Sequence, residues 1–228
     1  MKKISVIAAV LMIVFLLVAC GGGDSAGSDG GETTTPSINT DTDATEDNTV
    51  RPDTSASSSG GLPDNLADLT IVLNSDAITF PLPFEDFLAL GWVLESGYGH
   101  KPDKTLEPKQ FTMINLQKNG GSIIVITANY FSDETATVRQ GTVDGLSALD
   151  DTTEFPDGIK VNVSNIDDVI AAYGEPTESE NTEYYDAIIF IKEDYRIVFL
   201  YNPESGVVTQ INVLTSAIND GFEYVSLD

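Results

Sequence analysis

The stretch FTMINLQKNGGSIIVIT occupies residues 111–127, and it decides the class of fold that the chain can form. Runs of apolar and β-branched residues, 111–116 and 122–127, lie on either side of Asn119-Gly120. An Asn-Gly pair between two such runs is a strong signal for a β-hairpin, because both residues accept the positive φ angles of a tight turn. The stretch therefore predicts two antiparallel strands joined by a short turn.

A second stretch repeats this layout further along the chain. Residues 187–191 and 195–201 are two strand-like runs around the turn at 192–194. A further run follows each hairpin, at 137–143 and at 207–214. Each hairpin is therefore expected to gain a third antiparallel strand.

A short amphipathic helix is predicted before each hairpin. Residues 84–90 place their apolar side chains on one helical face, and Gly91 is expected to end that helix. Ser164 and Asp167 form a partial capping box at the start of the second helix, which is expected to stop at Gly174.

The order of elements is the same in the two halves of the chain. Strand-like runs precede both helices, at 70–73 and 77–80 before the first and at 159–163 before the second. The helical segments FEDFLA (84–89) and IDDVIA (166–171) align without a gap. We therefore predict an α+β fold of two half-repeats, each a short helix packed on an antiparallel sheet of about three to four strands.

The first twenty residues have the pattern of an exported precursor. Lys2 and Lys3 precede an apolar run at 4–19, which is too short for a convincing membrane-spanning helix. The run ends in LVAC at 17–20, and this motif resembles the lipobox of bacterial lipoproteins. The resemblance implies removal of the signal peptide, attachment of a diacylglycerol to the Cys20 sulfur, and anchoring at the extracytoplasmic face of the cell membrane. The alternative is an ordinary signal peptide with a cysteine there by chance.

The segment that follows Cys20 is rich in Gly, Ser, Thr, Asp and Glu and nearly lacks large apolar residues. It cannot bury enough surface to offset its ordering entropy, so we expect a flexible tether with a reach of roughly 35 Å. A calcium loop at 41–52 is not expected, because Glu46 and Pro52 replace the required Gly and Glu. The predicted organisation is a signal peptide at 1–19, a lipidated cysteine and tether at 20–62, and half-repeats at 63–150 and 151–228.

The charge of the chain limits its partners. It has 36 acidic and 11 basic residues, a formal net charge of -25. Such a chain repels nucleic-acid phosphates and anionic lipid head groups, so neither is an expected partner. The acidity is expected to keep an exported protein soluble; the alternatives are cation binding or a basic partner. Cys20 is the only cysteine, so no intramolecular disulfide can form.

The second half also resembles known envelope proteins. Its capped helix, the motif Tyr173-Gly174-Glu175-Pro176 and the three-stranded continuation resemble the SmpA/OmlA family of small envelope lipoproteins. Two such halves in tandem resemble the β-lactamase inhibitor protein fold, and the whole chain is similar to uncharacterised tandem-repeat lipoproteins of Gram-positive bacteria. The resemblance implies a helix packed on an antiparallel sheet and a non-catalytic, protein-binding role.

Residues suited to catalysis do not form a recognisable motif. His100, the only histidine, lies in a loop-like stretch without a second histidine to share a metal. Acid pairs at 85–86 and 167–168 fall in helix first turns, where they favour the helix dipole, and the pair at 150–151 is expected to be a solvated linker. Trp92 is expected in the core, the alternative being a sugar-stacking platform. No catalytic residue, metal ligand or cofactor site is predicted.

These features favour a membrane-anchored, non-enzymatic binding or adaptor domain at the cell envelope. The alternatives are an enzyme that acts on cell-wall glycan through carboxylates, and a solute-binding lipoprotein that feeds a transporter. The partners expected are the membrane, reached through the lipid, and either an envelope protein or a second copy of the chain.

One surface of the second hairpin is a candidate for that partner. Both faces of this hairpin are apolar, and one short helix can cover only one of them. Phe190, Phe199 and Tyr201 share a face and could form an aromatic patch for a protein partner. The alternative is that the other half-repeat or the C-terminal segment 222–225 covers the exposed face.

Overall fold

The computed structural model describes residues 61–96, 101–131, 133–182, 185–219 and 221–226, which belong to one compact unit. Strand accounts for 46% of the structure and helix for 16%, so this is an α+β chain in which antiparallel sheet predominates. In the described part, no helix has the length and apolar character needed to cross a membrane. The predicted signal peptide, Cys20 and the tether up to residue 60 lie outside the described residues.

The elements follow one another closely along the chain. The helices, with η for a 3-10 helix, are η1 Leu66–Asp68, α2 Phe84–Ala89, η2 Val138–Gln140, η3 Pro156–Gly158, α3 Ile166–Tyr173 and η4 Ala217–Asn219. The strands are β1 Thr70–Leu73, β2 Asp76–Thr79, β3 Leu82–Pro83, β4 Val93–Leu94, β5 Thr105–Leu106, β6 Gln110–Lys118, β7 Gly121–Ala128, β8 Ala136–Thr137, β9 Thr142–Ala148, β10 Thr153–Glu154, β11 Glu178–Asn181, β12 Asp186–Ile191, β13 Tyr195–Tyr201, β14 Val208–Thr215 and β15 Glu223–Tyr224.

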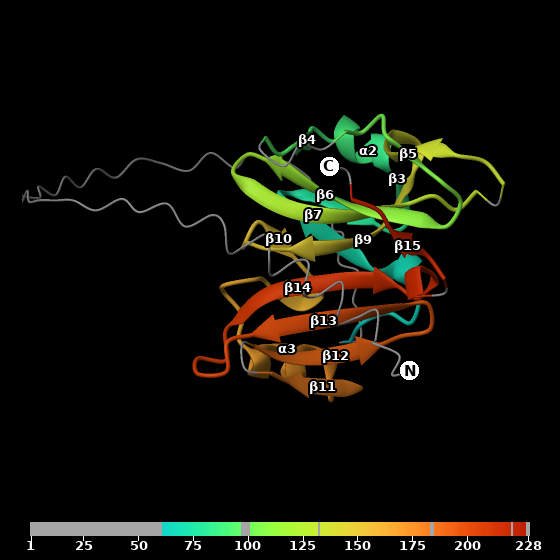
Figure 1. Cartoon of the computed structure of the whole chain (residues 1–228). Coiled ribbons are helices and arrows are strands. Elements are labelled where there is room, and N and C mark those ends of the chain that lie inside the picture. The colour runs from blue at the N-terminus through green and yellow to red at the C-terminus, as the bar shows by residue number, and fades with distance from the viewer. Residues whose placement is uncertain (1–60, 97–100, 132, 183–184, 220, 227–228) are drawn as a thin grey trace, which may run out of the picture. The chain divides into compact units, whose positions relative to one another are not determined.

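A ten-stranded sheet is the centre of the structure (Figure 1). Its main path runs β11-β12-β13-β14-β9-β7-β6-β15, while β3 pairs with β9 and β4 with β6. The predicted hairpin is confirmed as β6 and β7, and its turn residues Asn119 and Gly120 have φ angles of 49° and 87°. The second hairpin is confirmed as β12 and β13.

The third strand of the first half is not where the sequence pattern placed it. The prediction of a strand at 137–143 is wrong, because residues 136–140 form β8 and η2, and the strand β9 begins only at Thr142. Thr137 and Gln140 make a capping box that turns the backbone into η2. The buried side chain of Val138 sits in this 3-10 turn, so an apolar residue there did not indicate a strand. The run at 207–214 does form the strand β14.

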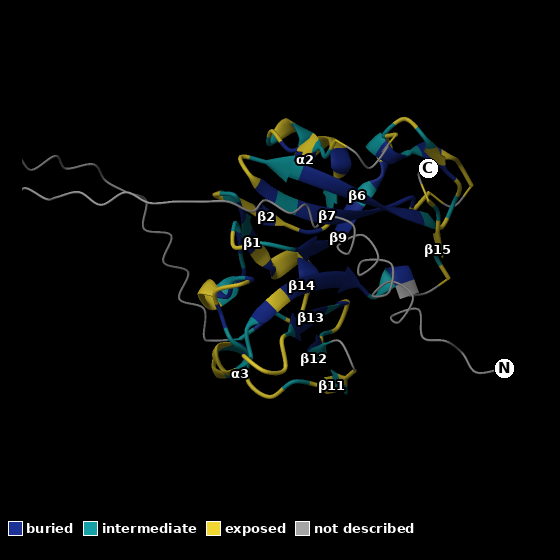
Figure 2. Cartoon of the chain, turned by 60° about the vertical axis from the view of Figure 1, so that its left-hand side comes forward, coloured by how far each residue is buried: buried dark blue, intermediate teal, exposed yellow. Residues whose placement is uncertain are grey.

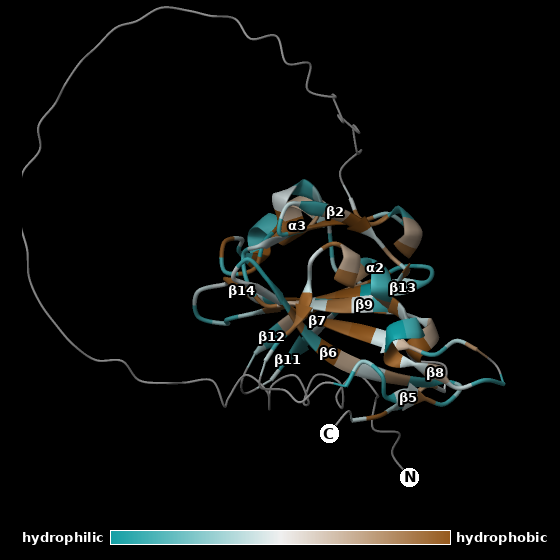
Figure 3. Cartoon of the chain, turned by 90° about the horizontal axis from the view of Figure 1, so that it is seen from above, coloured by the Kyte–Doolittle hydropathy of each residue, from teal (hydrophilic) through white to brown (hydrophobic). Residues whose placement is uncertain are grey.

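One face of the large sheet carries the hydrophobic core. Figure 3 places α2, α3 and β2 together on one side of the sheet. Phe84 and Phe87 of α2 and Val169 of α3 are fully buried there (Figure 2). A three-stranded sheet, β10-β1-β2, adds the buried Ile71 and Leu73 to the same core. Trp92 is 1% exposed, and its ring centroid lies 6.4 Å from that of Phe87. The predicted place of Trp92 in the core is therefore confirmed.

The segment before α3 differs from the prediction. The strand expected at 159–163 is wrong: apart from a single bridge at Lys160 these residues turn, and Asn162 has a φ of 60°. Ile159 and Val161 are buried as the strand pattern required, but Val163 is 64% exposed, so the expected alternation ends at the turn. The capping box lies one residue later than expected, with Asn165 accepting from the Asp168 amide and Asp168 accepting from the Asn165 amide. The Ser164 hydroxyl instead accepts from the Lys160 amide at 3.1 Å.

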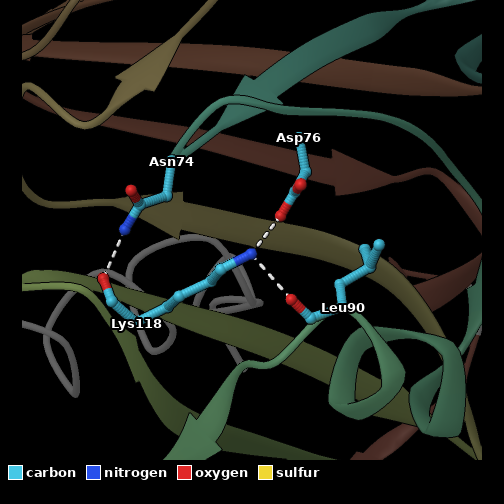
Figure 4. Close-up of polar contacts among 4 residues, drawn as sticks. All are labelled: Asn74, Asp76, Leu90 and Lys118. Carbon is cyan, nitrogen blue, oxygen red and sulfur yellow. Dashed lines mark hydrogen bonds and ion pairs between the residues drawn. The ribbon is translucent and has the colours of Figure 1, made fainter.

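A partly buried lysine joins three parts of the first half (Figure 4). The Lys118 ammonium forms an ion pair with Asp76 in the β1–β2 hairpin and donates to the Leu90 carbonyl at the end of α2 at 2.6 Å. The Asn74 amide donates to the Lys118 carbonyl. Because the Lys118 side chain is only 16% exposed, these contacts are poorly screened by water and fix the hairpin, helix and sheet together.

Candidate functional site

The aromatic residues predicted to form a partner surface lie mostly in the core. Phe190 is 4% exposed and Phe199 is fully buried. Their ring centroids lie 5.9 Å apart, and the ring centroid of Tyr173 in α3 lies 5.8 Å from that of Phe199. Tyr201 is partly buried and packs against the same core. The exposed aromatic patch proposed from the sequence is therefore wrong for Phe190 and Phe199, because α3 covers the face on which they lie.

The opposite face of the large sheet has a different character. Strand register places one row of side chains across it from β11 to β6, and these partners share a face because side chains alternate along a strand. The row consists of Glu178, Ile189, Val198, Asn212, Ser147, Ile124 and Asn115. The neighbouring row contains Arg196, Leu214, Gly145, Ile126 and Met113. We call this surface the second face.

Polar groups interrupt the apolar residues of the second face. Asn212, Ser147 and Asn115 lie in the first row, and the Gln210 amide donates to the Asn212 carbonyl oxygen at 2.8 Å. All four side chains are buried, as are Ile189, Val198 and Ile124. A hydrophobic core seldom holds so many amides, since each must keep its hydrogen bonds. The mixture is closer to that of an interface between proteins.

The described α-helices do not lie on the second face. Both pack with β2 on the other side of the sheet (Figure 3). Ile189, Val198 and Ile124 accordingly do not belong to the core cluster that includes Phe199 and Val169. The C-terminal segment does not cover the second hairpin either, because β15 pairs with β6 at the far edge of the sheet from β12.

An exposed pair of aromatic residues follows β7. Tyr130 is 43% exposed and Phe131 is 55% exposed. The buried Asn129 holds this loop, because its side-chain amide donates to the carbonyls of Leu106 and Glu134 at 2.9 and 3.0 Å and its carbonyl oxygen accepts from the Phe131 amide at 2.9 Å. In the sequence, the adjacent Tyr130-Phe131 pair was the available signal for this loop.

A buried carboxyl group lies at the junction between β9 and β14. The pairing of β7 with β9 shifts between Ile126 and Thr127, which leaves Asp144 unpaired as a β-bulge. The Thr215 hydroxyl donates to Asp144 Oδ2 at 3.3 Å, while Asp144 Oδ1 and the nearby buried Thr127 hydroxyl have no hydrogen-bond partner within the described structure. Burial raises the pKa of Asp144 to about 7.

The acidic pairs and His100, none of which is predicted to be catalytic, have structural roles or lie outside the described residues. The acid pairs 85–86 and 167–168 occupy helix first turns, as expected. Asp150 differs from the solvated linker that was predicted, because its carboxylate accepts from the Ser122 and Thr152 amides at 2.7 and 3.0 Å. No cluster of three or more metal-ligating side chains occurs among the residues that the structure describes. His100 lies outside them.

Comparison with family models, curated proteins and solved structures finds no match to the chain.

The Phe199→Ser variant tests the placement of the second-hairpin aromatics. Removing a buried ring and introducing a hydroxyl should lower the free energy of unfolding by about 3–5 kcal/mol, measured by urea denaturation. Val163→Ser is the control, because Val163 is 64% exposed and its loss should change stability by less than about 0.5 kcal/mol. Equal midpoints for the two variants would contradict the assignment of Phe199 to the core.

The Asp144→Asn variant tests the buried carboxyl group. A folded-state pKa of about 7 against a usual 3.8 means that the folded protein binds this proton more tightly than the unfolded chain. Ionisation in the fold should therefore cost about 4 kcal/mol above pH 7, and this cost should disappear as the pH falls from 7 towards 4. The variant should be more stable than the wild type at pH 8, and the difference should shrink at pH 4. A pH-independent difference would show that Asp144 does not titrate in this range.

Proposed function

We propose that this chain is a lipid-anchored envelope protein whose folded domain binds a protein partner and catalyses no reaction. The lipobox resemblance at 17–20 supports attachment through Cys20 to the extracytoplasmic face of the cell membrane, in a Gram-positive envelope. The composition of residues 21–62 supports a flexible tether between lipid and domain.

The second face is the observation that carries the binding role. It is a row of apolar and amide side chains across seven strands, from Glu178 on β11 to Asn115 on β6. Neither described α-helix packs on it. The amides of Asn212 and Gln210 would give an interface on this face directional hydrogen bonds. Because Ile189, Val198 and Ile124 are each 1% exposed within the chain, a partner would bind there only when the face becomes uncovered. A flat face of this kind suits another protein better than a small solute, which needs a concave pocket.

The proposed tandem half-repeats are consistent with the strand order. The three strands β6, β7 and β9 and the three strands β12, β13 and β14 each form a meander, and their third strands pair with one another. Each meander follows a short helix, α2 or α3. This arrangement supports boundaries near 63–150 and 151–228, with the two halves sharing one sheet.

The two competing functions have less support. A glycan-cleaving enzyme needs two carboxyl groups that face one another across a cleft. The pairs at 85–86 and 167–168 instead lie in helix first turns, where Asp168 completes a capping box. A solute-binding lipoprotein usually has two lobes and a cleft, whereas the described residues belong to one unit.

The anchor is tested with Cys20→Ala in the native host. Without the sulfur the lipid cannot be attached, so the variant should accumulate as unprocessed precursor or appear as soluble protein. Detergent phase partitioning and mass spectrometry of the wild type and the variant measure this. A variant that matures and partitions into detergent like the wild type would rule out the lipobox interpretation.

The binding face is tested by photocrosslinking in native envelopes. A benzoylphenylalanine at Asn212 should capture a discrete second protein, and Asn212→Arg should weaken binding of that protein by about tenfold or more, as expected for a charge buried in an interface. Val163, exposed before α3, provides the matched crosslinking position and the matched Val163→Arg control. Thermal denaturation checks that both arginine variants fold. Crosslinks from Asn212 that stay within the same chain would contradict the proposal.

A further inference from the structure

Two aromatic pairs lie at one corner of the domain, next to the exposed Phe131. The Tyr130 ring lies 5.0 Å from that of Phe222, and the Tyr224 ring lies 5.7 Å from that of Phe111. Tyr130, Phe131 and Tyr224 are among the few large apolar side chains that the described structure exposes. We call Tyr130, Phe131, Phe222 and Tyr224 the aromatic corner.

The corner is held in place by backbone and buried side-chain hydrogen bonds. The Lys109 amide donates to the Asn129 carbonyl at 3.1 Å, and the Glu223 amide donates to the Lys109 carbonyl at 2.8 Å. The three segments that carry the aromatics are thereby joined side by side, and the side chain of Asn129 fixes the loop that presents Phe131. The exposure of these rings is therefore built into the fold, and holding them exposed has a hydration cost.

The first described residues of the domain lie at the same end of the sheet. The Tyr195 hydroxyl donates to the Pro63 carbonyl at 2.5 Å, and the Leu66 amide donates to Asp194, so the start of the domain is fixed at the β12–β13 turn. Tyr195 is in register with Thr215 at the end of β14, and Leu214 with Gly145 near the start of β9. Gly145 is in register with Ile126, close to the end of β7 that leads into Tyr130.

The chain from the lipid thus enters the domain near the aromatic corner. Between β13 and β7 lie three interstrand spacings of about 4.8 Å, roughly 15 Å in all. The tether from Cys20 has an average reach of roughly 35 Å, so it allows this end of the domain to touch the surface to which the lipid is attached. A flexible tether does not orient the domain by itself, and a second contact is needed for that.

The charges around the corner differ from those of the whole chain. The segments 101–109, 129–139 and 222–226 carry four basic side chains among five acidic ones: Lys101, Lys104, Lys109 and Arg139, with Asp103, Glu107, Asp133, Glu134 and Glu223. The whole chain has 36 acidic and 11 basic residues. These three segments are therefore nearly neutral in a strongly acidic protein, so they repel a lipid surface less than the rest of the chain, including Glu193 and Asp194 of the β12–β13 turn.

We propose that the aromatic corner is a membrane-contact site that inserts Tyr130 and Phe131 into the interfacial layer of the bilayer that holds the lipid anchor. The Tyr130 side chain is suited to this layer because its ring can be buried while its hydroxyl reaches the head groups, and Phe131 adds an apolar ring. The near-neutral charge of the corner fits zwitterionic or uncharged head groups. This inference rests on the proposed anchoring through Cys20.

The test uses the full lipidated chain in phosphatidylcholine vesicles with brominated acyl chains. Cys20 is the only cysteine and its sulfur would carry the lipid, so an environment-sensitive fluorophore can be attached to Thr135→Cys, an exposed position beside the corner. Val163→Cys is the matched control, because the neighbouring Asn162 amide donates to the carbonyl of Val208 at the opposite end of the sheet. We expect the bromines to quench the fluorophore at position 135 and not at position 163.

The aromatic side chains should be required for this contact. Adding Tyr130→Ser and Phe131→Ser to the Thr135→Cys chain should reduce quenching to the level at position 163, and Phe131→Trp should retain it. Equal quenching at 135 and 163, or quenching that persists in the double serine variant, would overturn the proposal. Protection of position 135 in native envelopes but not in pure lipid vesicles would also overturn it and indicate a protein or glycan at the corner.

Failure of the anchor can be told apart from failure of the contact. A chain that does not float with vesicles and carries no acyl group contradicts the anchoring. The same fluorophore positions are then measured in Cys20→Ala chains held by an N-terminal histidine tag on nickel-chelating lipid. Absence of quenching at position 135 in those vesicles contradicts the membrane-contact site itself.

Discussion

The pairing of β9 with β14 is the contact on which the rest of the structure depends. It joins strands that are more than sixty positions apart in the sequence, from Ile211 opposite Ala148 to Leu214 opposite Gly145. A Cβ atom at position 145 would lie 2.7 Å from the Val213 carbonyl oxygen, which is closer than real side chains approach a backbone atom. Glycine at this position is therefore a steric requirement of the junction. Without the junction, each hairpin would leave an edge strand unpaired, and neither would form part of a continuous face.

The continuous sheet sets the character of its two faces. The helices and the small β10-β1-β2 sheet pack against one side of the large sheet. The Phe190 and Phe199 rings are therefore buried in a single core with those of Tyr173 and Phe155. The second face receives the alternate residues of the same strands and keeps its amides. Asp144 lies at the β-bulge next to Gly145. The shift in pairing there leaves Asp144 as the one residue of β9 without a partner on β7. The raised pKa of Asp144 is the electrostatic cost of this junction.

Local signals in the sequence predicted the elements whose conformation is decided locally. Asn119-Gly120 specified its turn through backbone preference, and the helix at 84–89 was set by its apolar periodicity. The strands expected at 159–163 and 137–143 failed because turns also bury apolar side chains, as they do those of Val161 and Val138. Tertiary pairing decided the rest. No local pattern in the sequence predicts that β14 pairs with β9. This pairing and the positions of the helices decide that Phe199, and not Val198, faces the core.

The candidate surfaces show the same division. The apolar character of both hairpin faces was visible in the sequence, but the choice between them required the placement of α3. Asp144 could not be recognised from the sequence, because its burial follows from a register shift. The Tyr130-Phe131 pair can be found in the sequence, but the sequence does not show whether these rings are exposed or form the buried end of a strand.

The two proposed contacts use different directions of the sheet, and this makes them compatible. The aromatic corner lies at the end of the strands, whereas the second face runs along their length. A domain that touches the bilayer through Tyr130 and Phe131 would stand with its strands directed away from the membrane, and the row from Ile189 to Ile124 would then face sideways along the membrane surface. In that orientation a partner embedded in or held at the same membrane would approach the second face without displacing the corner. The membrane contact would thus reduce the orientations that the tether allows, and it would lower the entropic cost of binding at the second face.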